Sequence, residues 1–180
     1  MSWCILSLDV SASSTGWAIM APKFGDYGII TTSPKLLRSE RLVVFRAELI
    51  KVILNYKPTA IVMEDTFSGL NPKTLKILSE FAGVAKETCQ QFTQIDPYII
   101  STNTIKAYFK TKAKEDMFDV VLELLEFDKS KWTFKKDNDI IDAIAMGICY
   151  ADSVIGVESF REEREYGYIY NIGGKDGKKR

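Results

Sequence analysis

The most informative absence in this 180-residue chain is histidine, of which it has none. Without histidine the protein cannot use imidazole for acid–base catalysis or for binding zinc. Its 24 basic and 24 acidic residues leave no net charge, whereas a dedicated nucleic-acid binder is usually basic. A neutral chain is still compatible with DNA binding if several acids are held on metal ions and the rest of that face is basic.

Cysteine and long apolar runs are also scarce. Cys4, Cys89 and Cys149 are widely spaced in apolar surroundings, which favours buried reduced thiols over a disulfide or zinc framework. No apolar run approaches the ~20 residues of a membrane helix, and the N-terminus lacks the pattern of a signal peptide. With 46% hydrophobic and 27% charged residues, the composition is typical of a globular protein, and we expect a cytoplasmic one.

Five apolar segments predict strands. They span residues 3–10, 16–21, 27–32, 60–64 and 98–101. Short spacers with Pro22, Gly25 and Gly28 predict hairpins between the first three, whereas helical patterns precede the last two. We therefore expect an α/β fold, in which a mixed five-stranded sheet of three antiparallel hairpin strands plus two parallel strands is flanked by helices.

Helical periodicity covers most of the remaining chain. Helices are expected over residues 38–56, 71–92, 104–109, 114–127 and from about 137 to 153. Pro58 ends the first, Asn71 and Pro72 are a cap and first residue for the second, and Asp137 or Asn138 caps the last. We predict one domain over residues 1–155 and a C-terminal extension, residues 156–180, that is partly disordered.

Four carboxylates carry the chemical prediction. Asp9 and Glu64 end apolar strands, and Asp139 and Asp142 lie three apart on one helix face. If the first and fourth strands are neighbours, two of these acids meet at the carboxyl ends of the strands, where α/β folds bind ligands. Clustered carboxylates need a cation, and hard oxygen ligands suit Mg²⁺ or Mn²⁺.

Each acid also has a simpler interpretation. Asp9 could cap a turn, and Asp139 could cap the last helix beside Asp137. Asp65 and Asp137 are expected to be solvated or capping residues rather than metal ligands. The spacing in the sequence does not by itself bring the four acids together.

The motifs resemble those of a known family. The matching segments are Asp9-Val-Ser-Ala-Ser-Ser-Thr-Gly-Trp17, Met63-Glu-Asp-Thr-Phe67, the helix from Asn71 with its internal Gly83, Thr104-Ile-Lys106 with Lys114, and Asp139-Ile-Ile-Asp-Ala-Ile-Ala145. In this order they resemble the RuvC-type Holliday junction resolvases of the ribonuclease H-like nuclease superfamily. The resemblance covers residues 3 to about 153.

The resemblance implies a structure-specific, metal-dependent endonuclease that resolves four-way (Holliday) DNA junctions by paired phosphodiester hydrolysis. Two Mg²⁺ ions, for which Mn²⁺ can substitute, would activate water and stabilise the leaving oxygen. The catalytic and metal-binding residues would be Asp9, bridging both ions, Glu64 on one ion, and Asp139 and Asp142 on the other. A homodimer, joined through the helix over residues 71–92, would place two sites on one junction.

The resemblance and the local composition also predict DNA contacts. The candidates are Phe67, Lys106, Lys114 and, in the basic and aromatic loop 129–136, Lys131, Lys135 and Lys136. Phe67 would stack on or wedge between bases, and the lysines would neutralise phosphates. Alternatively, Phe67 packs on the core, the lysines are solvated, and the loop is a hydrophobic clasp for the last helix.

Departures from the family pattern leave alternatives open. Ser11 stands where glycine is usual, the segment between Lys106 and Lys114 is short, and residues after 153 have no counterpart. Such variation occurs in phage members, so a phage-encoded protein is one hypothesis. A broader branched-DNA nuclease shares the chemistry. A phosphotransferase of the actin and sugar-kinase class would need a second domain, and a non-catalytic junction-binding protein would have lost its acids.

Overall fold

A five-stranded sheet forms the centre of the computed structural model, which describes residues 3–22, 25–65 and 71–156. Its strands are β1 (Ile5–Asp9), β2 (Ser14–Met20), β3 (Asp26–Thr31), β4 (Ala60–Glu64) and β5 (Tyr98–Ile100). Their order across the sheet is β3-β2-β1-β4-β5. β1, β2 and β3 are antiparallel, whereas β4 is parallel to both β1 and β5, so the predicted mixed sheet is confirmed.

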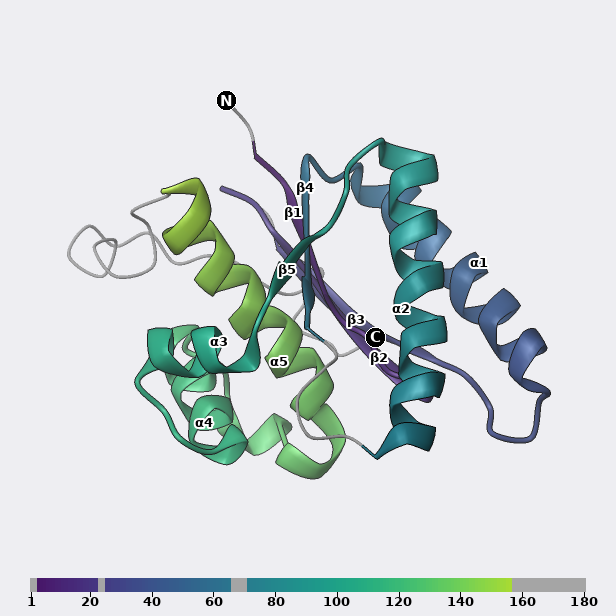
Figure 1. The fold of residues 1–180 in the computed structure, drawn as a ribbon. Helices are drawn as coiled ribbons and strands as arrows, with labels where there is room; N and C mark the ends of the chain where they lie inside the picture. The colour runs from purple at the N-terminus through teal and green to yellow at the C-terminus, as the bar shows by residue number, and fades with distance from the viewer. Residues whose placement is uncertain (1–2, 23–24, 66–70, 157–180) are drawn as a thin grey trace.

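The register of β1 and β4 determines where the chemistry lies. Leu8 of β1 is paired with Met63 of β4 in parallel, so the next residues, Asp9 and Glu64, end the two strands side by side. Both strands point the same way, and their carboxyl ends therefore meet at one edge of the sheet (Figure 1).

Side chains alternate between the two faces of the sheet with the period of two expected for strands. Leu6 and Leu8 pack in one hydrophobic cluster, whereas Ile5 packs in the other. Asp9 shares the face of Ile5, and Glu64 shares the face of Val62. Two acids from different strands are thereby directed to the same side.

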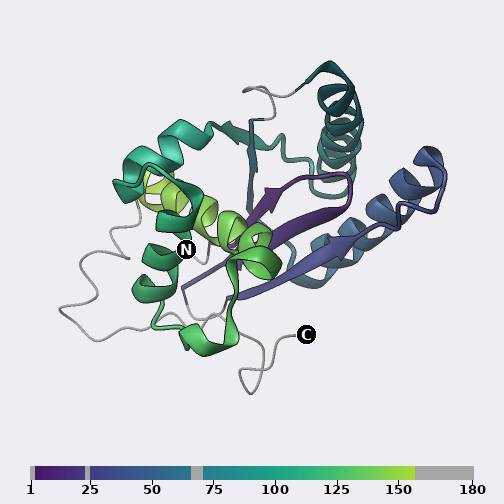
Figure 2. The same cartoon turned by 90° about the horizontal axis from the view of Figure 1, so that it is seen from below.

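The cluster that contains Leu6 and Leu8 is covered by α1 (Arg38–Tyr56) and α2 (Pro72–Thr93), which lie together on one face of the sheet (Figures 1 and 2). The predicted boundaries of both helices hold to within a residue. Asn71 accepts a hydrogen bond from the amide of Thr74 at 3.0 Å and so caps α2, as the sequence predicts.

The opposite face is covered by α3 (Thr102–Phe109), α4 (Lys114–Leu124) and α5 (Phe134–Tyr150), and α5 continues into a π-helical turn over Ala151–Ile155. α5 lies between the sheet and α4, and its residues from 140 to 149 are all buried. Surroundings of this kind explain a stretch of helix that is apolar on nearly every side, with Asp142 as the exception. None of the helices in the described ranges is both long and apolar enough to cross a membrane.

The start of α5 corrects the sequence prediction. The helix begins at Phe134 after Thr133 at the cap position, rather than after Asp137 or Asn138. The carboxylate of Asp137 does serve the helix start, because it accepts the backbone N–H of Thr133 at 2.9 Å. Asp139 therefore lies in the second turn of α5. All of the predicted C-terminal extension beyond residue 156 lies outside the described residues.

Two glycines let α5 approach the sheet closely. A Cβ on Gly16 of β2 would lie 1.9 Å from the carbonyl oxygen of Asp139, and a Cβ on Gly147 of α5 would lie 2.7 Å from Cγ of Met20 and 2.9 Å from Oγ of Ser7. One contact is near the start of the helix and the other is near its end. Any side chain at Gly16 must therefore push the start of α5 away from the sheet.

We predict that Gly16→Ala destabilises the protein by about 1–3 kcal/mol, because overpacking against backbone atoms cannot be relieved by a rotamer change. The measurement is the free energy of unfolding in urea. Gly83→Ala is the matched control, because Gly83 lies inside helix α2 and a Cβ there meets nothing within 4 Å. This substitution should stabilise the protein by about 0.5–1 kcal/mol. Equal effects of the two substitutions would contradict the close contact.

Candidate active site

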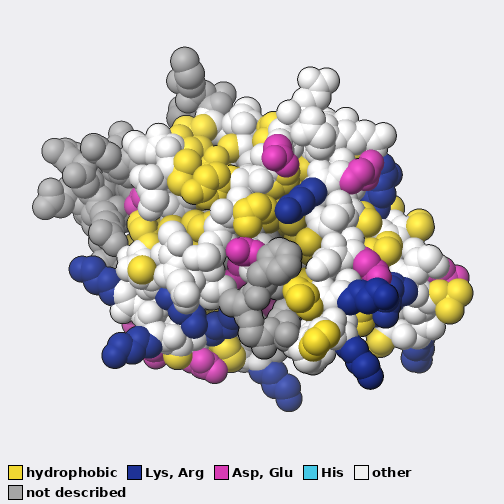
Figure 3. All heavy atoms as spheres, viewed as in Figure 1, with side chains coloured by type: hydrophobic (Ala, Val, Ile, Leu, Met, Phe, Trp, Pro, Cys, Tyr) yellow, Lys and Arg dark blue, Asp and Glu magenta, His cyan; other side chains and the backbone are white. Residues whose placement is uncertain are grey.

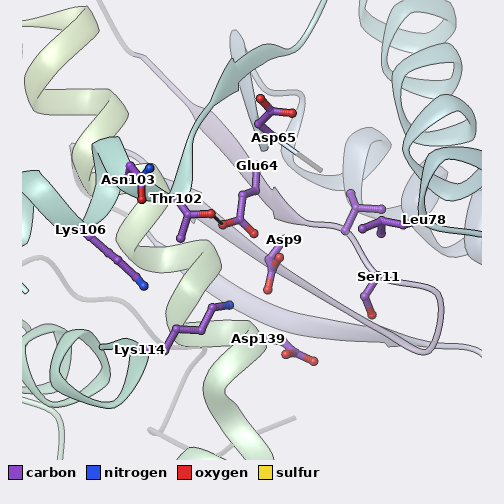
Figure 4. Close-up of a pocket in the computed structure, with 11 residues that line it drawn as sticks. Asp9, Ser11, Glu64, Asp65, Leu78, Thr102, Asn103, Lys106, Lys114 and Asp139 are labelled. Atoms are coloured by element: carbon purple, nitrogen blue, oxygen red, sulfur yellow. Dashed lines mark hydrogen bonds between the residues drawn. The ribbon is translucent and has the colours of Figure 1, made fainter. Parts of the chain in front are cut away.

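A cavity of about 450 Å³ opens where β1 and β4 end (Figure 4). It is lined by Asp9, Val10, Ser11, Glu64, Asp65, Leu78, Thr102, Asn103, Lys106, Lys114 and Asp139. The lining residues come from β1, β4, α2, α3, α4 and α5 and the segments between them. Three of the four predicted acids and two of the predicted lysines therefore share one cavity.

Asp9 lies at the centre of this group. Burial raises the pKa of the Asp9 carboxyl well above its usual range, and the nearby carboxylates of Glu64, Asp142 and Asp139 raise it further, while the Lys114 ammonium opposes them. The site therefore concentrates negative charge around Asp9 and lacks enough positive charge to balance it.

Glu64 is held by a hydroxyl that the sequence prediction missed. Oγ1 of Thr102 donates a hydrogen bond of 2.5 Å to Oε1 of Glu64 (Figure 4). Thr102 is the first residue of α3, which follows β5, and β5 is the strand next to β4. The hydroxyl thus fixes the orientation of a carboxylate from the neighbouring strand.

Asp139 is oriented in a similar way from β2. Oγ of Ser14 donates a hydrogen bond of 2.5 Å to Oδ2 of Asp139, and Nδ2 of Asn138 donates to Oδ1 at 2.9 Å. Ser14 shares the α5-facing side of β2 with Gly16, so the close approach at Gly16 also brings this hydroxyl to the carboxylate. Alternation along a strand could have indicated Ser14, but its partner on α5 lies 125 residues away.

Asp142 is buried and faces a smaller space of about 10 Å³ that it shares with Glu64, Thr102 and Lys114. Its Oδ2 accepts a hydrogen bond from the ammonium of Lys114, with 2.6 Å between the two atoms. Burial raises the pKa of the Asp142 carboxyl, and this ion pair offsets only part of the increase. Lys114 therefore contacts one of the four predicted metal-binding acids.

The donor set suits a hard divalent cation. Its ligating atoms are carboxylate oxygens, with hydroxyls and an amide close behind them, and this is the chemistry that Mg²⁺ and Mn²⁺ prefer. Burial and the neighbouring carboxylates both raise the pKa of Asp9, and a cation bound there would offset these effects. Three of these acids line the same cavity, and the fourth, Asp142, is paired with Lys114.

The other two acids near the motifs lie as the sequence predicts. The Asp65 side chain is exposed, and it points away from Asp9 (Figure 4). Asp137 is buried at the start of α5, where it accepts the backbone N–H of Thr133. Asp65 is thus a solvated acid and Asp137 a capping acid.

The aromatic residues of the loop before α5 take the second of its two predicted roles. Trp132 is 8% exposed; it stacks on Phe127 with ring centroids 5.0 Å apart and packs against Tyr27 at 5.3 Å. The aromatic residues therefore form the hydrophobic clasp. Lys131 is exposed and pairs with Asp128 at 3.5 Å.

Lys135 and Lys136 are exposed in the first turn of α5, one turn before Asp139. Lys106 lies in the cavity wall with its ammonium toward Lys114 and the acids (Figure 4). On the surface, Lys and Arg side chains lie over α3 and α4 and also on the side of α1 and α2, with acidic side chains between them (Figure 3). Phe67 lies outside the described residues.

Acids at the carboxyl ends of β1 and β4, facing an acid pair on a helix packed across the sheet, define a protein of the ribonuclease H-like class. The model of the family "Crossover junction endodeoxyribonuclease RuvC" matches residues 5–150. The chain belongs to this family.

Individual members of this family are similar to the chain over most of its length. A crossover junction endodeoxyribonuclease RuvC of Ehrlichia ruminantium (strain Welgevonden) is 31% identical over 160 residues, which are 83% of this chain and 97% of that protein. One of Caldicellulosiruptor saccharolyticus is 29% identical over 155 residues, covering 81% and 90%. The solved structure of Thermus thermophilus RuvC has a TM-score of 0.71 at 16% identity, with 85% of this chain and 96% of that chain covered.

A second Thermus thermophilus structure, RuvC in complex with Holliday junction substrate, has a TM-score of 0.70 at 16% identity and covers 83% of this chain and 92% of that chain. At this level of identity the structural likeness establishes the ribonuclease H-like fold. The predictions of fold class and family are therefore confirmed.

We predict that Asp9→Asn stabilises the metal-free protein at neutral pH by on the order of 1 kcal/mol, because a neutral amide removes repulsion with three carboxylates. Unfolding in urea with chelator present measures this. The gain should shrink as the pH falls and wild-type Asp9 takes up a proton. Asp65→Asn is the control and should stay within about 0.5 kcal/mol of wild type. A destabilised Asp9→Asn protein would contradict the repulsive cluster.

Proposed function

We propose that this protein is a metal-dependent endodeoxyribonuclease that resolves four-way DNA junctions by paired phosphodiester hydrolysis. The observation that supports it most directly is the cavity at the ends of β1 and β4. There, Asp9, Glu64 and Asp139 meet the cations of Lys106 and Lys114, in a chain that belongs to the crossover junction endodeoxyribonuclease family. Acids for metal and cations for phosphate are both needed for cutting DNA.

Asp9, Glu64, Asp139 and Asp142 would hold Mg²⁺, with Mn²⁺ able to substitute and two ions in each site. When bound, such ions activate a water molecule and stabilise the leaving oxygen of the phosphodiester. The chain itself orients the carboxylates, because Thr102 holds Glu64 and Ser14 holds Asp139. Since the protein contains no histidine, no imidazole base takes part.

DNA would reach the cavity along its lysine-bearing wall. Lys106 lines the cavity from the last turn of α3, so it can contact the scissile phosphate or one next to it. Lys135 and Lys136 are exposed one turn before Asp139, and Lys131 is exposed just before them. This group can follow the DNA backbone away from the site.

A symmetric junction needs two cuts, and a homodimer supplies two sites related by a two-fold axis. We propose α2 as the dimer contact. This helix belongs to the layer that covers one face of the sheet, and one of its residues, Leu78, lines the cavity. A contact through α2 would couple the arrangement of the two sites.

Cleavage should require Mg²⁺ or Mn²⁺ and stop with chelator. Asp9→Asn should reduce the cleavage rate by at least about 10³-fold while leaving junction binding measurable, because lysine contacts to phosphates remain. The assay compares labelled four-way, forked, flapped and linear DNAs. Paired cuts confined to the four-way junction support a resolvase, whereas equal cutting of flaps and forks supports a broader nuclease. Robust cleavage by chelated enzyme would refute the metal mechanism.

Phe67 is proposed to unstack bases at the junction. It follows Glu64 by three residues, and stacking on an extruded base is worth about 1–3 kcal/mol. Phe67→Ala should therefore slow junction cleavage strongly and change the unfolding free energy little. A core phenylalanine would instead cost about 3–5 kcal/mol of stability on truncation. Thermal unfolding and cleavage by the same sample distinguish the two, and a large stability loss with normal specific activity would contradict the proposal.

A further inference from the structure

The ion pair between Lys114 and Asp142 lies within the group of acids proposed to bind metal. The Lys114 ammonium is 2.6 Å from Oδ2 of Asp142. The lysine is the first residue of α4, and the acid lies in the middle of α5. The pair therefore also joins two helices across the rim of the cavity.

Lys114 serves more than one acid. It lines the main cavity together with Asp9, Glu64 and Asp139, and it faces the smaller space that Asp142 and Glu64 share. Its ammonium thus offsets repulsion among carboxylates drawn from β1, β4 and α5. Lys114 is therefore a cation shared by all of these carboxylates.

We infer that the Lys114 ammonium stands in for the second metal ion in the metal-free protein, and that it must leave Asp142 before that carboxylate can bind metal. The inference rests on the proposed metal-dependent function. It makes Lys114 a positioning residue that holds Asp142 until the metal binds, in addition to its predicted contact with DNA.

Two physical reasons support an exchange over simultaneous binding. First, the ammonium already occupies Oδ2 of Asp142 at hydrogen-bond distance, so this oxygen cannot bind a metal ion while the contact lasts. Second, an ammonium and a divalent ion at neighbouring positions repel each other, and this repulsion is only weakly screened inside a protein.

The lysine has a path out of the cluster. Its side chain is 40% exposed, whereas that of Asp142 is 9% exposed, so the ammonium can swing outward while the acid stays in place. The wall it would swing toward carries Lys106 (Figure 4). Displacement by metal would thus add a second free cation to the surface that faces DNA, and metal binding and phosphate binding would favour each other.

The test measures Mn²⁺ binding to the full chain without DNA, by calorimetry and by the paramagnetic resonance signal of free Mn²⁺. Lys114→Met removes the charge and keeps much of the side-chain volume, and should bind Mn²⁺ at least about tenfold more tightly than wild type. Lys114→Arg keeps the charge and should bind no more tightly than wild type. Lys106→Met is the matched control, because Lys106 lines the same cavity, and it should stay within about threefold.

The thermal midpoint provides a second readout if Lys114→Met is poorly folded without metal. Mn²⁺ should then raise the midpoint of Lys114→Met more than that of wild type, because a tighter ligand stabilises the folded state more. Unchanged or weaker Mn²⁺ binding by Lys114→Met, or tighter binding by Lys106→Met to the same extent, would overturn the inference.

The outcomes also separate this inference from the proposed function. If wild type cuts junctions with Mn²⁺ while Lys114→Met binds Mn²⁺ no more tightly, the exchange is wrong and the function stands. If wild type neither binds Mn²⁺ nor cuts junctions, both fail.

Discussion

The approach of α5 to β2 at Gly16 is the contact on which the site depends. With the carbonyl of Asp139 lying where a Cβ would be, the helix can bring Asp139 and Asp142 to the face of the sheet that already carries Asp9 and Glu64. The hydrogen bond from Ser14 to Asp139 forms in the same place. A glycine in a strand usually weakens it; here the loss of a side chain is what permits two layers to share one cavity.

Carboxylates held close together repel one another and destabilise the fold, and several contacts offset part of this repulsion. Hydroxyls from Thr102 and Ser14 hold Glu64 and Asp139, and Lys114 neutralises Asp142. The raised pKa of Asp9 shows that repulsion and burial are not fully offset. A site that keeps unbalanced negative charge in the folded state is prepared to bind cations, and such compromises between stability and function are common in enzymes.

The neutral net charge of the chain does not describe the cavity, where both kinds of charge meet. Asp9, Glu64 and Asp139 line it together with Lys106 and Lys114. Composition alone argued mildly against DNA binding because it averages over both groups. This arrangement results from the fold, since the strand ends deliver two acids to the cavity while α3 and α4 each deliver one lysine.

The sequence alone determined the order of the elements, the mixed sheet, the cap at Asn71 and the positions of Asp9 and Glu64 at strand ends, because periodicity, caps and strand ends are local features. That these two strand ends lie side by side was established by the pairing of β1 with β4. The sequence could not determine that α5 begins at Phe134, because Trp132 and Phe134 pack on distant aromatic residues such as Tyr27 and Phe118. Only the tertiary structure assigned Thr102 to Glu64, Ser14 to Asp139 and Lys114 to Asp142. These pairs are 38, 125 and 28 residues apart, and contacts at such separations depend on how the layers pack.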